Sequence, residues 1–171
     1  TTGRDVRFDM TRSEGYHRFC NKLWNASSYV LSQIDGADAG GATLGPTEAW
    51  ILSRLRSVIG ATHEGFAAYR FDVVVQAIYD FTWHEFCDWY LEAAKPALKA
   101  GNAHTLRTLE EVLAVLLKLL HPMMPFLTSE LYQALTGKEE LALEAWPEPG
   151  GRDEEAERAF DLFIRTYEPK Y

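Results

Sequence analysis

Four side chains between residues 18 and 29 combine the groups needed to hold an unpaired RNA strand. Arg18, Lys22, Asn25 and Tyr29 follow one another at steps of four, three and four. In a helix these steps place the four side chains in one narrow stripe. Cations suit phosphates, an amide suits a base edge, and an aromatic ring suits stacking on a base. The spacing is compatible with RNA contact, although an ordinary solvated helix face with these residue types is the more frequent case.

The stripe requires a helix over residues 14–34. Apolar side chains in this segment gather on the other half of the cylinder, which predicts that they are buried. They are Tyr16, Phe19, Cys20, Leu23, Trp24, Ala26, Val30, Leu31 and Ile34.

Further helices are predicted along the rest of the chain, which makes the fold class all-α. Pro46 suits the first turn of a second helix, and Gly137 suits the end of a fifth. The remaining helices are expected at residues 71–100, 105–121 and 153–167, with a glycine-rich linker over residues 35–45. Short extended segments are expected at residues 1–9 and 141–147. We predict a lead-in over residues 1–9, a helical bundle over residues 10–137, and a strap with a last helix over residues 138–171.

The aromatic-rich third helix also has a charged face. Glu85, Asp88, Glu92 and Lys95 recur at steps of three, four and three. This spacing indicates a stripe that faces water.

Composition excludes several classes of protein. Hydrophobic residues make up 47% of the chain and aromatic residues 13%, which is too apolar for a disordered chain. Charged residues interrupt the apolar runs too often for a membrane span, so we expect no membrane and a cytoplasmic protein. The net charge is −8. Residues 1–70 carry 8 basic and 7 acidic side chains, and residues 71–171 carry 9 and 18. Attraction for phosphate should therefore favour the N-terminal part.

No catalytic or metal-binding set is predicted. Glu14 and His17 form one Glu-x-x-His pair, whereas a di-iron bundle needs two pairs and two more carboxylates. His84 and Glu85 lack the second histidine of a zinc-protease helix. The glycines of residues 35–45 do not form a phosphate-binding motif. The two cysteines, Cys20 and Cys87, lie in apolar helical patterns and are expected to be buried free thiols.

Five ordered stretches resemble the valyl-tRNA synthetases, which are class I aminoacyl-tRNA synthetases. The stretches are G-R-D-V-R-F at residues 3–8, F-C-N-K-L-W-N-A at 19–26, W-I-L-S-R-L at 50–55, F-C-D-W-Y-L-E at 86–92, and H-P-M-M-P-F-L-T-S-E-L at 121–131. The resemblance covers about residues 3 to 147. It implies the helical bundle that receives the anticodon stem-loop of a valine tRNA in an enzyme that ligates valine to that tRNA using ATP.

The resemblance also implies where the rest of that enzyme lies. The H-I-G-H-type and K-M-S-K-S-type signatures of catalysis do not occur here, so a catalytic domain is expected upstream in the same polypeptide. This chain alone should then be inactive and need no cofactor, while ATP and magnesium would serve the full-length enzyme. We expect a monomer. A helical protein-interaction module that does not bind RNA is the alternative.

The resemblance indicates which residues would meet RNA. Related synthetases place an amide and an aromatic ring of the first helix against anticodon bases, which matches Asn25 and Tyr29. The end of the F-C-D-W-Y-L-E helix would lie beside them and bring in Leu91, Glu92 and Lys95. Valyl enzymes often have a basic residue where this chain has Ser28. The expected RNA-binding set is therefore Arg18, Lys22, Asn25, Ser28, Tyr29, Leu91, Glu92 and Lys95. An equally simple role for Asn25 is to tie down a nearby loop.

Overall fold

The computed structural model describes residues 10–34 and 44–167, and these residues are helical without any β-strand. This confirms the predicted all-α class. In chain order the elements are α1 (Met10–Ile34), α2 (Pro46–Ala67), α3 (Phe71–Asp80), η1 (Phe81–Tyr90), α4 (Leu91–Lys99), α5 (Ala103–Leu120), α6 (Pro125–Thr136), η2 (Leu141–Leu143) and α7 (Glu154–Tyr167). The extended lead-in expected over residues 1–9 and most of the expected linker lie outside the described residues.

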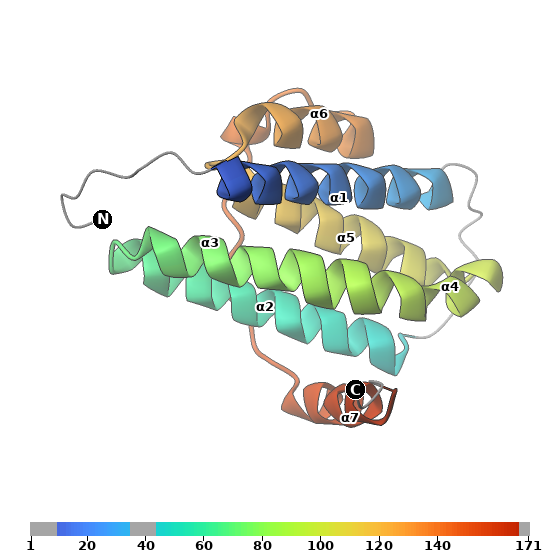
Figure 1. The fold of residues 1–171 in the computed structure, drawn as a ribbon. Coiled ribbons are helices and arrows are strands. Elements are labelled where there is room, and N and C mark those ends of the chain that lie inside the picture. Colours follow the sequence, from blue (N-terminus) through green and yellow to red (C-terminus); the bar gives the residue numbers. More distant parts are fainter. Residues whose placement is uncertain (1–9, 35–43, 168–171) are drawn as a thin grey trace.

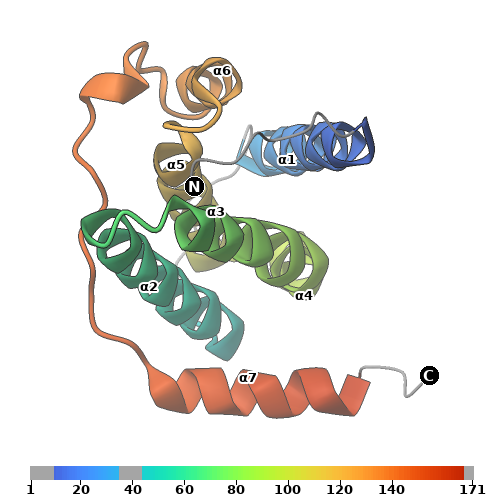
Figure 2. The same cartoon turned by 60° about the vertical axis from the view of Figure 1, so that its left-hand side comes forward.

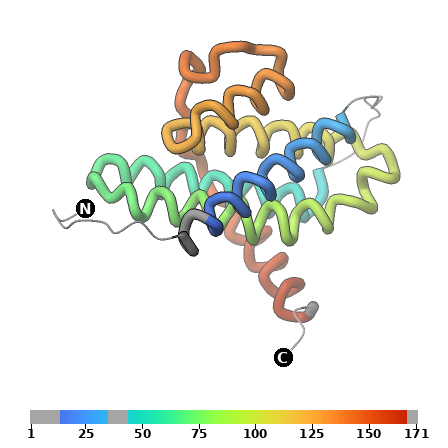
Figure 3. Tube along the Cα trace, turned by 45° about the horizontal axis from the view of Figure 1, so that its top comes forward, coloured from blue at the N-terminus to red at the C-terminus, as the bar shows by residue number. Residues whose placement is uncertain are grey.

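The helices form a bundle around the long rod made by α3, η1 and α4 (Figure 1). This rod runs antiparallel to α2, and α1 lies along its other side. The turned view in Figure 2 shows α5 behind the rod, α6 beyond α5, and α7 as a separate layer below α2. The trace in Figure 3 shows α1 inclined to the rod, and the two are in contact at η1. Two non-adjacent segments of sequence are thereby brought together.

Local sequence signals set several helix ends. Pro46 occupies the first turn of α2 after the extended Gly45. The Asn102 side chain accepts hydrogen bonds from the backbone N–H groups of His104, at 2.9 Å, and Thr105, at 3.3 Å, and so caps α5. Gly137 ends α6 with φ of 73°, a left-handed conformation that costs glycine little. These ends agree with the sequence prediction within a few residues.

The rod contains a π-helical segment that the sequence analysis did not predict. Residues 81–90 have π-helical hydrogen bonding, so this stretch is wound more widely than an α-helix. Side chains beyond it therefore drift from the faces expected at 3.6 residues per turn. Pro96 lies inside α4, and the helix continues to Lys99.

The predicted water-facing stripe of Glu85, Asp88, Glu92 and Lys95 is accessible to solvent, with Glu85 as a partial exception. The side chains of Asp88, Glu92 and Lys95 are 44%, 63% and 44% exposed. Glu85 is 24% exposed, since it points to α2 and accepts two hydrogen bonds from Arg54, at 2.8 Å each. Asp88 also pairs with Lys22 of α1.

The buried face of α1 is narrower than predicted. Phe19, Leu23 and Val30 are in the core. Tyr16 is 65% exposed and Trp24 is 47% exposed, so the prediction that both are buried is wrong. They lie at the margins of a helix whose main contacts are with α5, α6 and η1.

The segment after α6 also differs from the prediction. Residues 141–143 form a 3-10 turn, whereas an extended segment was expected over residues 141–147. Leu141 is buried and Leu143 is exposed. The backbone N–H of Glu144 donates to the carbonyl of Leu141 and closes the turn, because burying Leu141 requires the chain to fold back here.

Cys20 and Cys87 are free thiols, as predicted, but they are half-buried rather than buried.

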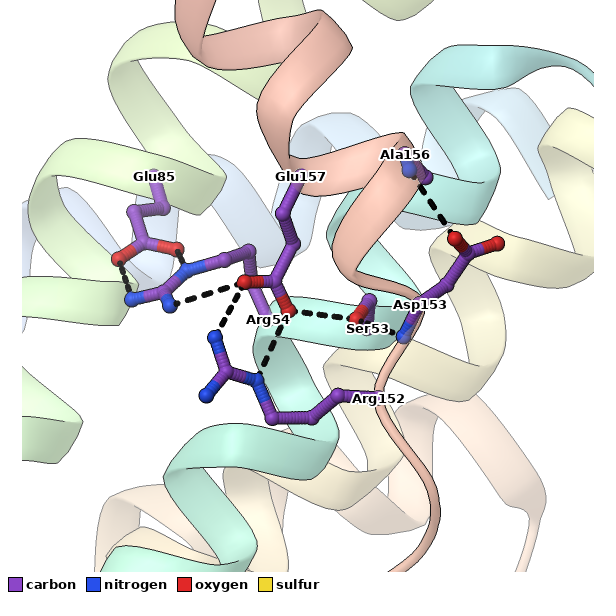
Figure 4. A network of polar contacts seen from close by, with 7 residues as sticks. All are labelled: Ser53, Arg54, Glu85, Arg152, Asp153, Ala156 and Glu157. Carbon is purple, nitrogen blue, oxygen red and sulfur yellow. Dashed lines mark hydrogen bonds and ion pairs between the residues drawn. The ribbon is translucent and has the colours of Figure 1, made fainter.

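The last helix packs on α2 through one aromatic stack and one polar network. The rings of Phe160 and Trp50 lie 3.9 Å apart between centroids, at 19°. In Figure 4 the carboxylate of Glu157 accepts hydrogen bonds from Ser53 and Arg152 and lies beside Arg54. The backbone N–H of Asp153 donates to Ser53 Oγ at 2.7 Å.

No helix in the described part of the chain is both long and apolar enough to cross a membrane.

Candidate nucleic-acid interface

An open pocket of about 270 Å³ lies between α1 and the second half of the rod. It brings together six of the eight residues predicted to bind RNA: Lys22, Asn25 and Tyr29 from α1, and Leu91, Glu92 and Lys95 from α4. We call this the α1–α4 pocket. Residues 62 or more positions apart in sequence thus form one concave surface, because α1 packs against the rod.

The other two predicted residues lie outside the pocket. Arg18 is exposed one turn before Lys22, and its guanidinium lies 3.8 Å from the Glu14 carboxylate. Ser28 is exposed on α1 immediately before Tyr29. Both are accessible from solvent, but neither lines the cavity.

Two pocket residues were missed by the sequence analysis. Ala26 stands between Lys22 and Tyr29 at helical spacing, and its small side chain leaves room between them. Cys87 precedes Leu91 by four residues. Burial raises the pKa of the Cys87 thiol to about 12, so the group stays protonated and forms part of an uncharged wall. The helical spacing was a usable signal for both residues.

The Lys22 ammonium is held at the pocket by two residues of η1. Its Nζ donates to Asp88 Oδ1 at 2.5 Å and lies 3.9 Å from the centroid of the Trp83 ring. His84 Nδ1 lies 3.4 Å from the second oxygen of Asp88. A carboxylate and an indole face together fix the position of a cation, and they also screen part of its charge.

The opposite wall offers a second charged pair. Lys95 Nζ lies 2.6 Å from both carboxylate oxygens of Glu92, one helical turn away. Both side chains are largely exposed, so water or a ligand can compete for them. The wall can therefore present both an acceptor carboxylate and a donor ammonium.

The Tyr29 ring is half-buried and packs against the core while it lines the pocket. It is neither sealed in the protein nor free in solvent. A ring fixed in this way offers one flat surface at low entropic cost. Asn25 is exposed one turn earlier on the same helix, and its amide is available as both donor and acceptor.

The described residues provide no metal site. No cluster of three or more His, Cys, Asp or Glu side chains able to hold a metal ion occurs within residues 10–34 and 44–167. Glu85, half of the His84–Glu85 pair, is bound to Arg54. The charged groups around the pocket can thus bind a polar ligand, but they do not form a metal centre.

Comparison with known proteins gives a consistent result. Residues 48–168 match the family model described as the anticodon-binding domain of tRNA ligase. The valine–tRNA ligase of Thermus thermophilus is 62% identical over 161 residues, which are 94% of this chain and 19% of that ligase. The valine–tRNA ligases of Legionella pneumophila and Xanthomonas axonopodis pv. citri are 51% and 46% identical, over 80% and 90% of this chain and 16% and 17% of their own lengths. The chain therefore spans less than a fifth of the length of these relatives.

Proposed function

Because this chain belongs to the family of anticodon-binding domains of tRNA ligases, we propose that it reads the anticodon of a valine tRNA as part of a valine–tRNA ligase. The α1–α4 pocket is the observation that carries this proposal. It combines an aromatic face, amide and carboxylate acceptors, and two ammonium groups in one open cavity. These are the groups that hold unpaired RNA bases and their phosphates.

Each side chain can be given a role. Valine anticodons share adenine and then cytosine at their second and third positions. Tyr29 stacks on one splayed base, Asn25 pairs with the adenine edge, and Glu92 accepts from the cytosine amino group. Lys22 and Lys95 contact the RNA backbone.

The remaining residues of the predicted set act at the edges of the site. Leu91 supplies an apolar wall against the stacked base. Arg18 and Ser28 lie on the exposed side of α1, where they contact phosphates or sugars that follow the loop out of the pocket. Arg18 reaches further than Ser28 and bears a charge, so it is the stronger phosphate ligand.

The proposed ligase joins valine to its tRNA with ATP and magnesium. The similarity to valine–tRNA ligases supports placing ATP and magnesium in a catalytic domain outside this chain. Residues 10–137 are the proposed RNA-binding bundle, and the remainder of the chain adds a last helix, α7, that packs on α2. We further propose a monomeric, cytoplasmic enzyme. The alternative expected from the sequence, a protein-interaction module that does not bind RNA, gains no support from the similarity to valine–tRNA ligases.

Replacing Tyr29 with Ala tests the proposed site. The valine anticodon stem-loop should bind about 5- to 150-fold more weakly to Tyr29→Ala, because loss of one stacked base costs about 1 to 3 kcal/mol. Tyr29→Phe keeps the ring and should retain most of the affinity. The measurement is a fluorescence titration of the 171-residue chain with labelled stem-loop at fixed salt.

The matched control is Tyr16→Ala, the same substitution at an exposed tyrosine of the same helix. It should leave stem-loop affinity unchanged. A stem-loop with a non-valine anticodon should bind the unmodified chain more weakly. Equal affinity of Tyr29→Ala and the unmodified chain would remove Tyr29 from the site, and equal affinity for both stem-loops would refute anticodon reading.

A further inference from the structure

The Lys22 ammonium has two partners on η1 that act differently on its charge. Asp88 accepts a hydrogen bond from Lys22 Nζ at 2.5 Å, and its carboxylate offsets the positive charge. The ring of Trp83 lies with its centroid 3.9 Å from the same nitrogen. An indole has no net charge and attracts a cation through the quadrupole of its face. It can therefore hold Lys22 without cancelling the charge that an RNA phosphate would bind.

The Trp83 ring is the last of three rings that stack in a column between α1 and the rod. Between centroids, Phe19 of α1 lies 5.0 Å from Tyr79 at 26°, and Tyr79 lies 5.7 Å from Trp83 at 16°. Phe19 is buried, and the other two rings are half-buried against the core. Lys22 follows Phe19 by one helical turn, so α1 supplies both the ring at one end of the column and the cation at the other. The column fixes the plane of the indole under the ammonium.

Trp83 itself is not among the residues that line the α1–α4 pocket, whereas Lys22 is. Any effect of the indole on a ligand in the pocket must then pass through the lysine. The Lys22 side chain is 27% exposed, so its ammonium remains within reach of a ligand. A lysine that is already ordered in the free protein loses less side-chain entropy when it binds.

We propose that Trp83 is a positioning residue for RNA, whose ring holds the Lys22 ammonium at the α1–α4 pocket in a form that a phosphate of the anticodon loop can bind. This inference rests on the proposed function, in which Lys22 contacts the RNA backbone. A phosphate competes with Asp88 for the N–H groups of Lys22. It does not compete with the indole, which occupies one side of the ammonium and leaves N–H donors free on the other.

A double-mutant cycle between Trp83 and Lys22 tests this role in the 171-residue chain. Trp83→Leu removes the ring and keeps an apolar side chain, so the valine anticodon stem-loop should bind about two- to fivefold more weakly at low salt. In a chain that already carries Lys22→Met, Trp83→Leu should change the affinity by less than about 1.5-fold, because no ammonium is left to position. Trp83→Phe keeps an aromatic face and should retain most of the affinity.

Two further measurements report on the Lys22 ammonium directly. The slope of log affinity against log salt should be shallower by about 0.7 in Trp83→Leu, which corresponds to the loss of one phosphate contact. In NMR spectra recorded without RNA, the ring current of the indole should shift the methylene protons next to Lys22 Nζ upfield. This shift should disappear in Trp83→Leu.

Trp146→Leu is the matched control. Trp146 is also half-buried, and it packs edge-on against Phe66, 5.7 Å away between centroids and outside the α1–α4 pocket. Its replacement should lower the melting temperature, as Trp83→Leu does, and should leave stem-loop affinity unchanged. Loss of a half-buried indole is thereby separated from loss of the contact with Lys22.

The proposal would be wrong if Trp83→Leu weakened binding by the same factor with and without Lys22→Met, because Trp83 would then act through the fold or touch RNA itself. It would also be wrong if Trp83→Phe bound as weakly as Trp83→Leu, if the salt slope did not change, or if the Lys22 resonances were not shifted. Failure of the proposed function looks different. The unmodified chain would then bind valine and non-valine stem-loops equally, and the RNA role of Trp83 would fall with it, although the Lys22 resonances would remain shifted.

Discussion

The ion pairs on the two sides of η1 have different surroundings. On the α2 side, Arg54 donates two hydrogen bonds to Glu85, and its guanidinium lies 3.7 Å from the Glu157 carboxylate. Glu157 belongs to α7 and points toward α2, where its side chain is only 9% exposed (Figure 4). On the α1 side, Lys22 pairs with Asp88 beside the open α1–α4 pocket. One helical segment thus contributes to a sealed network and to a solvent-facing one.

This difference distinguishes charged groups that hold the fold together from charged groups that a ligand can reach. Every oxygen of Glu157 has a partner: Ser53, Arg152 and Arg54 surround it. A ligand could reach the Glu157 carboxylate only by displacing α7, whereas the side chains of Arg54 and Arg152 are 29% and 45% exposed. The Lys22–Asp88 pair borders a cavity, so RNA could approach it without unfolding anything. Substitutions on the α2 side should therefore change stability, and substitutions on the α1 side should change RNA affinity.

Phe160→Ala should have the largest effect on the sealed side. The Phe160 ring is buried and stacks on Trp50, so its removal leaves a cavity between α7 and α2. Stability should fall by about 3 to 4 kcal/mol. Urea unfolding measures this loss. Stem-loop affinity at a temperature where the variant is folded should be unchanged.

Leu162→Ala is the matched control for the stack. Leu162 is exposed on the same helix, and its truncation should cost less than about 0.5 kcal/mol. The division into two regions would be wrong if Phe160→Ala weakened stem-loop binding as much as Tyr29→Ala does. Equal stability losses for Phe160→Ala and Leu162→Ala would show that α7 is not held by the aromatic stack.

Glu157→Gln should have a smaller, pH-dependent effect. Hydrogen bonds from Arg152, helped by Ser53 and by the charges of Arg152 and Arg54, hold the pKa of Glu157 below its ordinary value of 4.5. A depressed pKa gives stability that is complete above the unfolded value and is lost as the pH falls through the folded value. At pH 7 the variant should be about 1 to 2 kcal/mol less stable.

The pH profile of this difference is the decisive measurement. Thermal unfolding from pH 7 down to pH 3 should show the gap between the parent chain and Glu157→Gln narrowing below about pH 4.5, where Glu157 takes up a proton in the unfolded parent chain before it does so in the folded one. Glu155→Gln, an exposed position on the same helix, should give a constant and small gap. A Glu157→Gln gap that stayed constant across this range would mean that its charge contributes nothing.

Sequence periodicity predicted that these α1 side chains share one face, and they do because α1 is a regular helix. Lys22, Asn25 and Tyr29 fall on one side at steps that α-helical winding preserves, and all three line the pocket. Leu91, Glu92 and Lys95 came from the family resemblance, and no residue pattern predicted that α4 would pack beside α1. That proximity depends on how the rod lies against α1, which is a property of the tertiary fold.

The same reasoning missed the partners of two side chains where the winding changes. Glu85 and Asp88 were assigned to one water-facing stripe on the assumption of 3.6 residues per turn, but η1 is wound more widely. Its turn directs Glu85 to Arg54 and Asp88 to Lys22. The contact between Arg54 and Glu157, which lies 103 positions later in the chain, was not predicted either, because helical spacing indicates only local neighbours.

Asp88→Asn should have the smallest effect on stability and a clear one on RNA. Lys22 and Asp88 are both partly exposed, so breaking their ion pair should cost less than about 1 kcal/mol. The substitution removes a negative charge beside the proposed RNA site and frees the Lys22 ammonium for phosphate. Stem-loop affinity at low salt should therefore rise about two- to fivefold and lose this advantage near 0.5 M salt, where charges are screened. Asp72→Asn makes the same charge change in an exposed pair at the start of α3 and should leave affinity unchanged. Weaker binding by Asp88→Asn would reverse this view: Asp88 would then position Lys22 for RNA, and the α1 side would depend on a fixed ion pair as the α2 side does.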